Sequence, residues 1–200
     1  MKFQELLEYV KFLNSFTAIK RTVKVTEEER LESNSEHSYQ LALVGWYVSE
    51  KLRLGLRKDL ILEYALVHDL VEVYAGDTDP YNHAEDFINS KEEREKKALE
   101  KIKGNFPDFP SLYDSIKRYE MFADREAKFL YLLDKILPVI NTYLSKDSYY
   151  FKSGVSYERW KKHLDTKRLK ANFGEEAFQD LLEQVASFFK SVDEGFFRDK

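Results

Sequence analysis

A short stretch of the chain, LVHDLVEVYAGDT over residues 66–78, carries more ionisable side chains than a buried helix usually holds. His68 stands beside Asp69, Glu72 follows about one turn later, and Asp77 comes just past the expected end of the helix. Residues three and four positions apart share one side of a helix, so the first three side chains occupy neighbouring surface. Imidazole nitrogens and carboxylate oxygens bind divalent cations, so this stretch is a candidate for part of a metal site.

Two further ionisable residues stand on apolar helical segments elsewhere in the chain. His37 precedes the run LALVGWYV, and Asp134 interrupts the run FLYLLDKILPVI. An ionised carboxylate in a core is costly unless it is paired or bound to a metal. Together with the histidine-aspartate pair, these residues give two imidazoles and two carboxylates. This donor set suits Mn²⁺, Co²⁺, Fe²⁺, Mg²⁺ or Zn²⁺, with positions left open for water and substrate.

The two remaining carboxylates are placed for work beside a metal rather than on it. Glu72 shares helix surface with the pair at 68–69, and a carboxylate next to a metal-bound water can orient that water or carry its proton. Asp77 lies beyond the helix end, where the loop can turn its carboxylate toward the same pocket. These two residues are therefore candidate catalytic groups.

Each of these residues also has a structural interpretation when it is taken alone. A histidine-aspartate pair on a helix is commonly structural, with each group hydrogen-bonded to a neighbour. Asp134 can pair with Lys135 or with a buried arginine, and His37 can be a satisfied histidine at a helix start. Glu72 and Asp77, taken singly, are more often solvated than catalytic. The metal site depends on their conjunction.

The spacing of apolar residues predicts an all-α chain. Low numbers of turn formers, 7 Gly and 4 Pro in 200 residues, disfavour a many-stranded sheet. A helix over about 36–53 is expected to begin after Ser35, and a helix over about 58–74 is expected to end at Gly76 in a left-handed conformation. Further helices are expected over about 3–13, 90–104, 111–122, 124–145, 156–173 and 175–192. We therefore predict a single domain over residues 1–200 with seven or eight helices, its core within about 1–145 and its C-terminal helices within about 156–190.

The segments between these helices are expected to be loops. KRTVKVTEEERLESNSEH, which ends at His37, is polar and charged, and the segments 77–89 and 146–155 are rich in turn formers. Ser90 and Glu93 have the spacing of a capping box for the charged helix that follows. His83 lies in a polar loop and His163 in a charged helix, so both are expected at the surface.

Charge and composition exclude several classes of function. The formal net charge of −4 gives no global basic field for nucleic acid. The absence of cysteine excludes disulfides and thiolate metal sites. No segment approaches the ~18 consecutive apolar residues of a membrane span, and the charged N-terminus does not resemble a signal peptide. We expect a cytoplasmic protein with no membrane or nucleic-acid partner.

The order of these motifs resembles a known family. ESNSEHSYQLA, then LVHDLVEVYAGDT, then LLDKI about 65 residues later is similar to the HD-domain metal-dependent phosphohydrolases. The arrangement H…HDxxExxxGD…D resembles, more narrowly, the small bacterial 5′-deoxynucleotidases and their archaeal and eukaryotic relatives. The resemblance covers roughly residues 1–145 and implies an HD-domain helical bundle.

The resemblance also implies roles for the residues singled out above. His37, His68, Asp69 and Asp134 match the metal ligands of the family, and Glu72 matches its catalytic acidic residue, which holds or activates the attacking water. Asp77 matches a residue implicated in catalysis and in contacts with the nucleotide sugar. The implied activity is hydrolysis of a (deoxy)ribonucleoside 5′-monophosphate to nucleoside and phosphate with a divalent metal, in a homodimer.

The chain departs from the family pattern in two respects. The 5′-deoxynucleotidases usually carry an arginine, often followed by tryptophan, soon after the first helix to hold phosphate and sugar. Here the stretch reads LNSFTAIKRTV, so Lys20 or Arg21 is expected to supply the charge. The loop that follows, VKVTEEERLESN, is longer than usual and is expected to line the mouth of the pocket.

Two other functions remain open at this point. One keeps the metal and moves the scissile bond, which gives a nucleotide pyrophosphatase or triphosphohydrolase. The other is a metal-binding domain without turnover that senses a nucleotide, although Glu72 and Asp77 would have no purpose in a purely structural site.

Overall fold

The chain folds mostly into helices, as the spacing of its apolar residues predicts. The computed structural model describes residues 1–26, 28–82, 84–192 and 195–198. In this part of the chain the helices are α1 (Phe3–Ala18), α2 (Asn34–Lys51), α3 (Lys58–Val67), α4 (Glu72–Ala75), α5 (Glu85–Asn89), α6 (Lys91–Asn105), α7 (Pro110–Glu120), α8 (Arg125–Leu144), α9 (Tyr149–Lys152), α10 (Tyr157–Ala171) and α11 (Glu176–Lys190). The short helices α4, α5 and α9 have 4, 5 and 4 residues, and the other helices have 10 or more. The predicted helical bundle is confirmed, and the short helices account for the elements beyond the predicted seven or eight.

The segment predicted as a loop before His37 instead forms a small antiparallel sheet. Strand β1 (Lys20–Lys24) pairs with strand β2 (Leu31–Ser33), and Lys20 lies opposite Ser33. The β-branched residues Thr22 and Val23 favour an extended chain, and Val23 is buried. Charged residues interrupt the alternation and the register is irregular between Lys20 and Lys24, which hides the strand pattern in the sequence.

Helix α2 begins two residues earlier than the sequence suggested. Ser33, not Ser35, is the N-cap: its hydroxyl accepts a hydrogen bond from the Glu36 backbone N–H at 3.3 Å. The Glu36 carboxylate in turn accepts from the Ser33 backbone N–H at 2.8 Å, which completes a capping box. The cap fixes the first turn of α2 and with it the position of His37.

The helix predicted over 58–74 is broken where its ionisable residues stand. After α3 ends at Val67, the backbone tightens, and the Glu72 N–H donates to the carbonyl of Asp69, three residues back, at 2.9 Å. Helix α4 then ends before Gly76, whose φ of +77° requires glycine, as expected from the sequence. Because of this turn, the side chains of His68 and Asp69 point in different directions from those they would have on a continuous helix.

Two other local predictions are wrong. The predicted loops over 77–89 and 146–155 contain the short helices α5 and α9. Ser90 makes no cap hydrogen bond with α6; its hydroxyl donates to the carbonyl of Phe87 at 3.2 Å. His83 lies outside the described residues.

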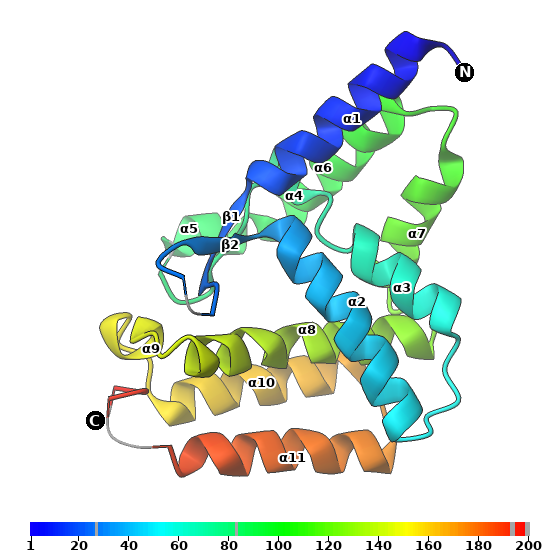
Figure 1. Cartoon of the computed structure of the whole chain (residues 1–200). Helices are drawn as coiled ribbons and strands as arrows, with labels where there is room; N and C mark the ends of the chain where they lie inside the picture. Colours follow the sequence, from blue (N-terminus) through cyan, green and yellow to red (C-terminus); the bar gives the residue numbers. More distant parts are fainter. Residues whose placement is uncertain (27, 83, 193–194, 199–200) are drawn as a thin grey trace.

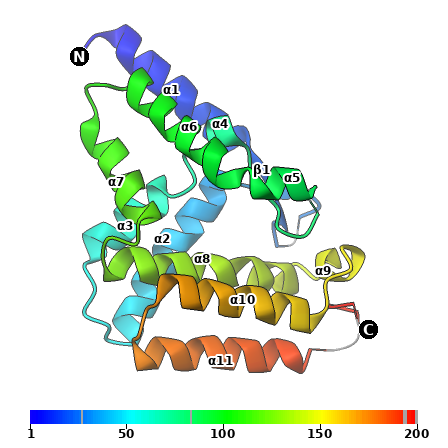
Figure 2. The same cartoon turned by 180° about the vertical axis from the view of Figure 1, so that it is seen from behind.

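Helix α8 is the centre of the fold. It contacts α2, α3, α7, α10 and strand β1, and α11 runs along the outer side of α10 (Figure 1). Seen from behind, α1 and α6 lie side by side and form an arm away from α11 (Figure 2). The arm has its own apolar cluster, which includes Phe12, Phe16 and Ile102. The site residues come from the junction between the arm and the helices around α8.

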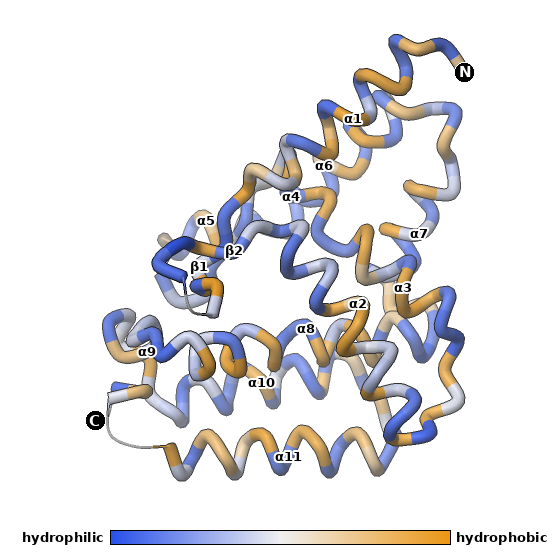
Figure 3. The backbone as a smooth tube through the Cα atoms, in the orientation of Figure 1, coloured by the Kyte–Doolittle hydropathy of each residue, from blue (hydrophilic) through white to orange (hydrophobic). Residues whose placement is uncertain are grey.

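Close packing holds α2 against this centre. A Cβ at Gly45 would lie 2.9 Å from Ile61 of α3 and 3.0 Å from Leu130 of α8, so only glycine allows this approach. Figure 3 shows apolar residues along α8 and α11 and a hydrophilic turn between β1 and β2.

Among the described residues, no helix has both the length and the apolar composition needed to cross a membrane.

Candidate metal centre and cavity

Three elements far apart in the sequence bring two histidines and an aspartate together. His37 comes from the first turn of α2, His68 follows α3, and Asp134 lies in the middle of α8. His37 Nε2 is 2.8 Å from Asp134 Oδ1, and His68 Nε2 is 3.9 Å from the same oxygen. All three residues are buried, with exposed fractions of 4% or less. The predicted histidines and Asp134 therefore share one polar site inside an apolar core.

Asp69 completes this group. Its Oδ2 lies 3.0 Å from His68 Nε2, and one ligand atom each of His37, His68 and Asp69 fit within 4.8 Å of one another. Atoms that bind one six-coordinate divalent ion at about 2.1 Å lie about 3.0 Å apart along each edge of the octahedron. The 3.0 Å between His68 Nε2 and Asp69 Oδ2 matches one such edge, so these two atoms fit a shared cation.

The hydrogen bonds of His68 agree with a role as a ligand. Its Nδ1 donates to the Ala65 carbonyl at 3.0 Å, which leaves the lone pair of Nε2 directed toward Asp69 and Asp134. This buried Nε2 has no hydrogen-bond partner among the described residues. A divalent cation bound between this nitrogen and the two carboxylates would satisfy all three, so the residues fit a divalent metal ion.

Asp134 contacts both the histidines and Lys135, the two kinds of partner that the sequence analysis considered for it. Its Oδ1 faces the histidines, and its Oδ2 accepts from Lys135 Nζ at 2.6 Å. Burial opposes ionisation, but the Lys135 charge and the His37 hydrogen bond together hold the pKa of Asp134 well below its ordinary value. The pairing with Lys135 thus keeps a carboxylate ionised where it faces the site.

Glu32 is a neighbour of the site that the sequence did not indicate. Its Oε1 lies 3.7 Å from His37 Nδ1 and 3.1 Å from Arg21 Nε, and its side chain is 7% exposed. Burial raises the pKa of Glu32 to about 7, although Arg21 opposes the rise. Carboxylates behind a metal-binding histidine commonly orient its ring. Glu32 stands within the quoted motif ESNSEH, but only the pairing of β1 with β2 shows that it faces inward.

Arg21 links the Glu32 carboxylate to Asp69 of the candidate metal site. Its Nη1 lies 3.0 Å from Asp69 Oδ2, opposite its contact with Glu32, and its side chain is 13% exposed. Burial would lower the pKa of Arg21, but the surrounding carboxylates, Asp69 first, raise it further above its ordinary value. The guanidinium therefore stays charged at the edge of the cavity.

Glu72 is held beside the cluster by an amide. Asn34 Nδ2 donates to Glu72 Oε2 at 2.6 Å, and both side chains are buried. Burial raises the pKa of Glu72 well above its ordinary value, and the charges of Asp69 and Asp77 add to the rise. A carboxyl with a raised pKa in this position is suited to take a proton from water.

A cavity of about 420 Å³ opens over these residues. Asp69, Glu72, Asp77, Asp134 and Arg21 all line it, whereas Lys20 is exposed and is not part of the lining. Burial raises the pKa of Asp77 while Arg21 lowers it. Of the predicted site residues, Arg21, Asp69, Glu72, Asp77 and Asp134 line this cavity, and His37 and His68 lie against two of them, Asp134 and Asp69.

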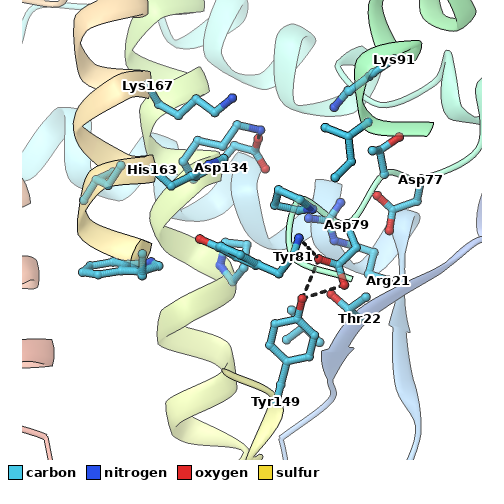
Figure 4. A pocket seen from close by; sticks show the side chains of 18 of the residues that line it. Arg21, Thr22, Asp77, Asp79, Tyr81, Lys91, Asp134, Tyr149, His163 and Lys167 are labelled. Carbon is cyan, nitrogen blue, oxygen red and sulfur yellow. Dashed lines mark hydrogen bonds and ion pairs between the residues drawn. The ribbon is translucent and has the colours of Figure 1, made fainter. Parts of the chain in front are cut away.

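A second wall of the cavity is built around Asp79, which the sequence analysis did not select. The Tyr149 hydroxyl donates to the Asp79 carboxylate at 2.7 Å, and the Tyr81 backbone N–H donates to it at 2.8 Å (Figure 4). These bonds tie the loop after Asp77 to helix α9. No motif predicted this wall, because its partners are about 70 residues apart.

The prediction that His163 lies at the surface is wrong. His163, on α10, is half-buried and lines the cavity, and so do Lys91 of α6 and Lys167 of α10 (Figure 4). Burial, and then the charges of Lys167 and Lys135, lower the pKa of His163 to about 4. The charged sequence of α10 concealed that one of its faces packs on α8.

Comparisons with known proteins agree with this geometry. A family model described as an HD domain matches residues 14–175. The protein named 5′-deoxynucleotidase HDDC2 of Xenopus laevis is 30% identical over 135 residues, which are 66% of this chain and 65% of that protein. The Homo sapiens protein of the same name is 30% identical over 135 residues, 66% of this chain and 64% of that one. The chain thus spans just under two thirds of the length of these relatives.

Solved structures share the fold. A protein described as a predicted metal-dependent phosphohydrolase from Magnetospirillum magnetotacticum superposes with a TM-score of 0.79 at 22% identity, over 98% of both chains. A conserved hypothetical protein from Pyrococcus furiosus superposes with a TM-score of 0.63 at 22% identity, over 90% of this chain and 99% of that one.

Proposed function

The chain belongs to the HD-domain family, and from this premise we propose that it is a metal-dependent phosphohydrolase acting on (deoxy)ribonucleoside 5′-monophosphates. The observation that carries the proposal is the convergence of two histidines on two aspartates that line one cavity, with Glu72 held beside them. The names of the relatives from Xenopus laevis and Homo sapiens support the same reaction.

We propose that His37, His68, Asp69 and Asp134 hold the divalent ion. His68 Nε2 is directed by the Ala65 carbonyl, and Asp134 is kept ionised by Lys135. A bound ion would polarise a phosphoryl oxygen and lower the pKa of a water ligand. The donor set of nitrogen and oxygen suits Mn²⁺, Co²⁺, Fe²⁺, Mg²⁺ or Zn²⁺.

Glu72, Arg21 and Asp77 would each have a separate role in the hydrolysis. Glu72, fixed by Asn34, would orient the attacking water and accept its proton as the new P–O bond forms. Arg21, held between two carboxylates, would face the charge on the phosphoryl group. The bond between phosphorus and the nucleoside oxygen would then break, and that oxygen would take up the proton that Glu72 accepted from the water. Asp77, which lines the same cavity, would contact the sugar.

The size and lining of the cavity support a nucleotide. Its volume of about 420 Å³ falls within the usual range for small-molecule sites, roughly 300–1,000 Å³. Tyr81, Tyr150 and Ile88 add an apolar and aromatic wall to the charged end, which is the combination that a base and a phosphate require.

The proposal is tested by phosphate release from a panel of nucleotides. The full chain is assayed with Mn²⁺, Co²⁺, Mg²⁺, Fe²⁺ and Zn²⁺ against nucleoside mono-, di- and triphosphates, with and without the 2′-hydroxyl. Release of nucleoside and phosphate from monophosphates supports the proposal. Release of pyrophosphate or triphosphate would give the alternative reaction, and binding without turnover would give a sensing domain.

We also propose that the chain forms a homodimer through α2. Helix α2 exposes a group of large apolar side chains, with Tyr39 67%, Leu43 44%, Trp46 39% and Tyr47 64% exposed. Contiguous apolar surface of this kind commonly marks an interface. Light scattering after gel filtration measures the mass directly. The Leu43→Glu, Tyr47→Glu double variant is expected to be a monomer, and a monomeric wild type would contradict the proposal.

A further inference from the structure

Three lysines line the cavity, and the proposed reaction uses one of them, Lys135, to keep Asp134 ionised. Lys91 stands at the start of α6, Lys135 in α8 and Lys167 in α10, and all three line the same cavity. Figure 4 shows Lys91 and Lys167 extending from opposite walls, with their ammonium groups directed into the space between them. Three helices thus direct positive charge into one part of the cavity.

These lysines differ in how their charge is compensated. Lys135 is paired with Asp134 at 2.6 Å, and Lys91 has a loose contact with Glu95 at 3.4 Å. Among the described residues, no ion pair includes Lys167. Burial, and then the charges of Lys135 and Lys91, lower the pKa of Lys167 to about 8, which places the three ammonium groups within each other's field. Even so, Lys167 is mostly charged at neutral pH.

The lysines are chemically different from the carboxylates that share the cavity with them. Four carboxylates, Asp69, Glu72, Asp77 and Asp134, also line the cavity, so an anion beside them would need a metal ion or Arg21 to bind. The lysines meet an anion directly, because their ammonium groups project into the cavity. Half-buried like charges repel one another, and a bound anion removes that repulsion.

We propose that Lys91 and Lys167 form a second anion subsite, which binds a further phosphate group of the substrate. The subsite rests on the proposed function, since it assumes that the cavity holds a phosphorylated substrate, and it extends that substrate from a 5′-monophosphate to a nucleotide with a second phosphate. A phosphate group carries nearly two negative charges and three acceptor oxygens, which matches two or three converging ammonium groups. The second phosphate is either the next group of a 5′-diphosphate or a phosphate on another oxygen of the sugar.

Affinity measurements test the subsite without relying on turnover. Calorimetric titrations are carried out on the full chain in Mn²⁺ with Glu72→Gln as background, so that ligands are not consumed. The ligands are deoxyadenosine 5′-monophosphate, 5′-diphosphate and 3′,5′-bisphosphate. The variants are Lys91→Met and Lys167→Met, and the matched control is Lys162→Met, which removes an exposed lysine of α10 that does not line the cavity.

We expect at least one of the two-phosphate ligands to bind tenfold or more tightly than the monophosphate, a difference of about 1.4 kcal/mol. Lys91→Met and Lys167→Met should each remove most of this advantage, and Lys162→Met should keep it. The stronger of the two ligands identifies where the second phosphate is carried.

Two results would overturn the subsite. One is equal affinity for the one-phosphate and two-phosphate ligands in the protein with all its lysines. The other is an equal loss of affinity for both kinds of ligand in the lysine variants, which would assign the lysines to the scissile phosphate. Neither result depends on activity, so absence of phosphate release from the wild type would refute the proposed function separately.

Discussion

The amide of Asn34 donates a 2.6 Å hydrogen bond to Glu72 Oε2, which joins the first turn of α2 to the start of α4 across 38 positions of sequence. Both side chains are buried. Asn34 follows the N-cap Ser33, so the capping box that starts α2 also places the donor that holds Glu72. One local motif therefore positions both a candidate metal ligand, His37, and the partner of the candidate base.

Asn34→Ala should lower kcat by about 10–100-fold, because a buried carboxyl that loses its hydrogen-bond partner costs roughly 1–3 kcal/mol and is no longer held in place. Metal content, measured by plasma mass spectrometry, should stay unchanged. The control is Asn105→Ala, which removes an exposed amide that donates to the Tyr74 hydroxyl. Equal kcat in Asn34→Ala and the control would show that Glu72 does not need this donor.

His68→Ala should weaken Mn²⁺ binding by more than about 100-fold, since it removes the imidazole nitrogen that faces Asp69 and Asp134. Calorimetric titration of the metal-free protein with Mn²⁺ measures the change. His163→Gln, at the far wall of the cavity, is the matched control and should keep wild-type affinity. If both variants bind Mn²⁺ alike, His68 is not a ligand.

Arg21→Lys should reduce kcat/KM by about 10–100-fold even though the charge is kept. Arginine reaches Glu32 and Asp69 at once through different nitrogens, and a single ammonium group lacks this fork. Lys20→Ala, which removes the exposed neighbouring lysine, should change kcat/KM less than twofold. A larger effect from Lys20→Ala than from Arg21→Lys would return the substrate role to Lys20.

The pH dependence of stability should report on His163. Its pKa is about 4 in the folded chain and near 6.5 when unfolded, so below pH 6.5 the unfolded state binds the proton more readily. Stability should therefore fall as the pH drops from 6.5 to 4. Between pH 7 and 5 the loss from this group is roughly 1 kcal/mol, reduced by its partial exposure. Urea unfolding of His163→Gln should show a smaller loss than wild type, and equal losses would contradict the assignment.

The spacing of apolar and ionisable residues carried much of the prediction. His37, His68, Asp69 and Asp134 stand on long apolar segments, and burying those segments forces their polar side chains to meet. The long apolar run after residue 124 likewise predicted the central helix α8. Its N-cap residue is Asp124, whose carboxylate accepts a hydrogen bond from the Ala127 N–H at 2.9 Å. Strong local periodicity and the cost of unpaired buried charge are both visible in one sequence.

The rest of the site depends on contacts that no local pattern contains. Glu32 and Arg21 face inward only because β1 and β2 pair, and their irregular register obscures the alternation. Lys167 and His163 belong to a helix of low apolar content, and their place in the cavity follows from the packing of α10 on α8. Such residues become visible only when distant helices are placed together.

The most direct test of the proposed mechanism is the Glu72→Gln variant, with Glu92→Gln as the control because Glu92 is 91% exposed. Phosphate release from deoxyribonucleoside 5′-monophosphates is measured for the full chain in Mn²⁺, and metal content is measured on the same samples. We predict that Glu72→Gln retains its metal and loses activity by about 10²–10⁴-fold, the usual contribution of a general base. Undiminished phosphate release from the Glu72→Gln protein, with its metal bound, would contradict the account.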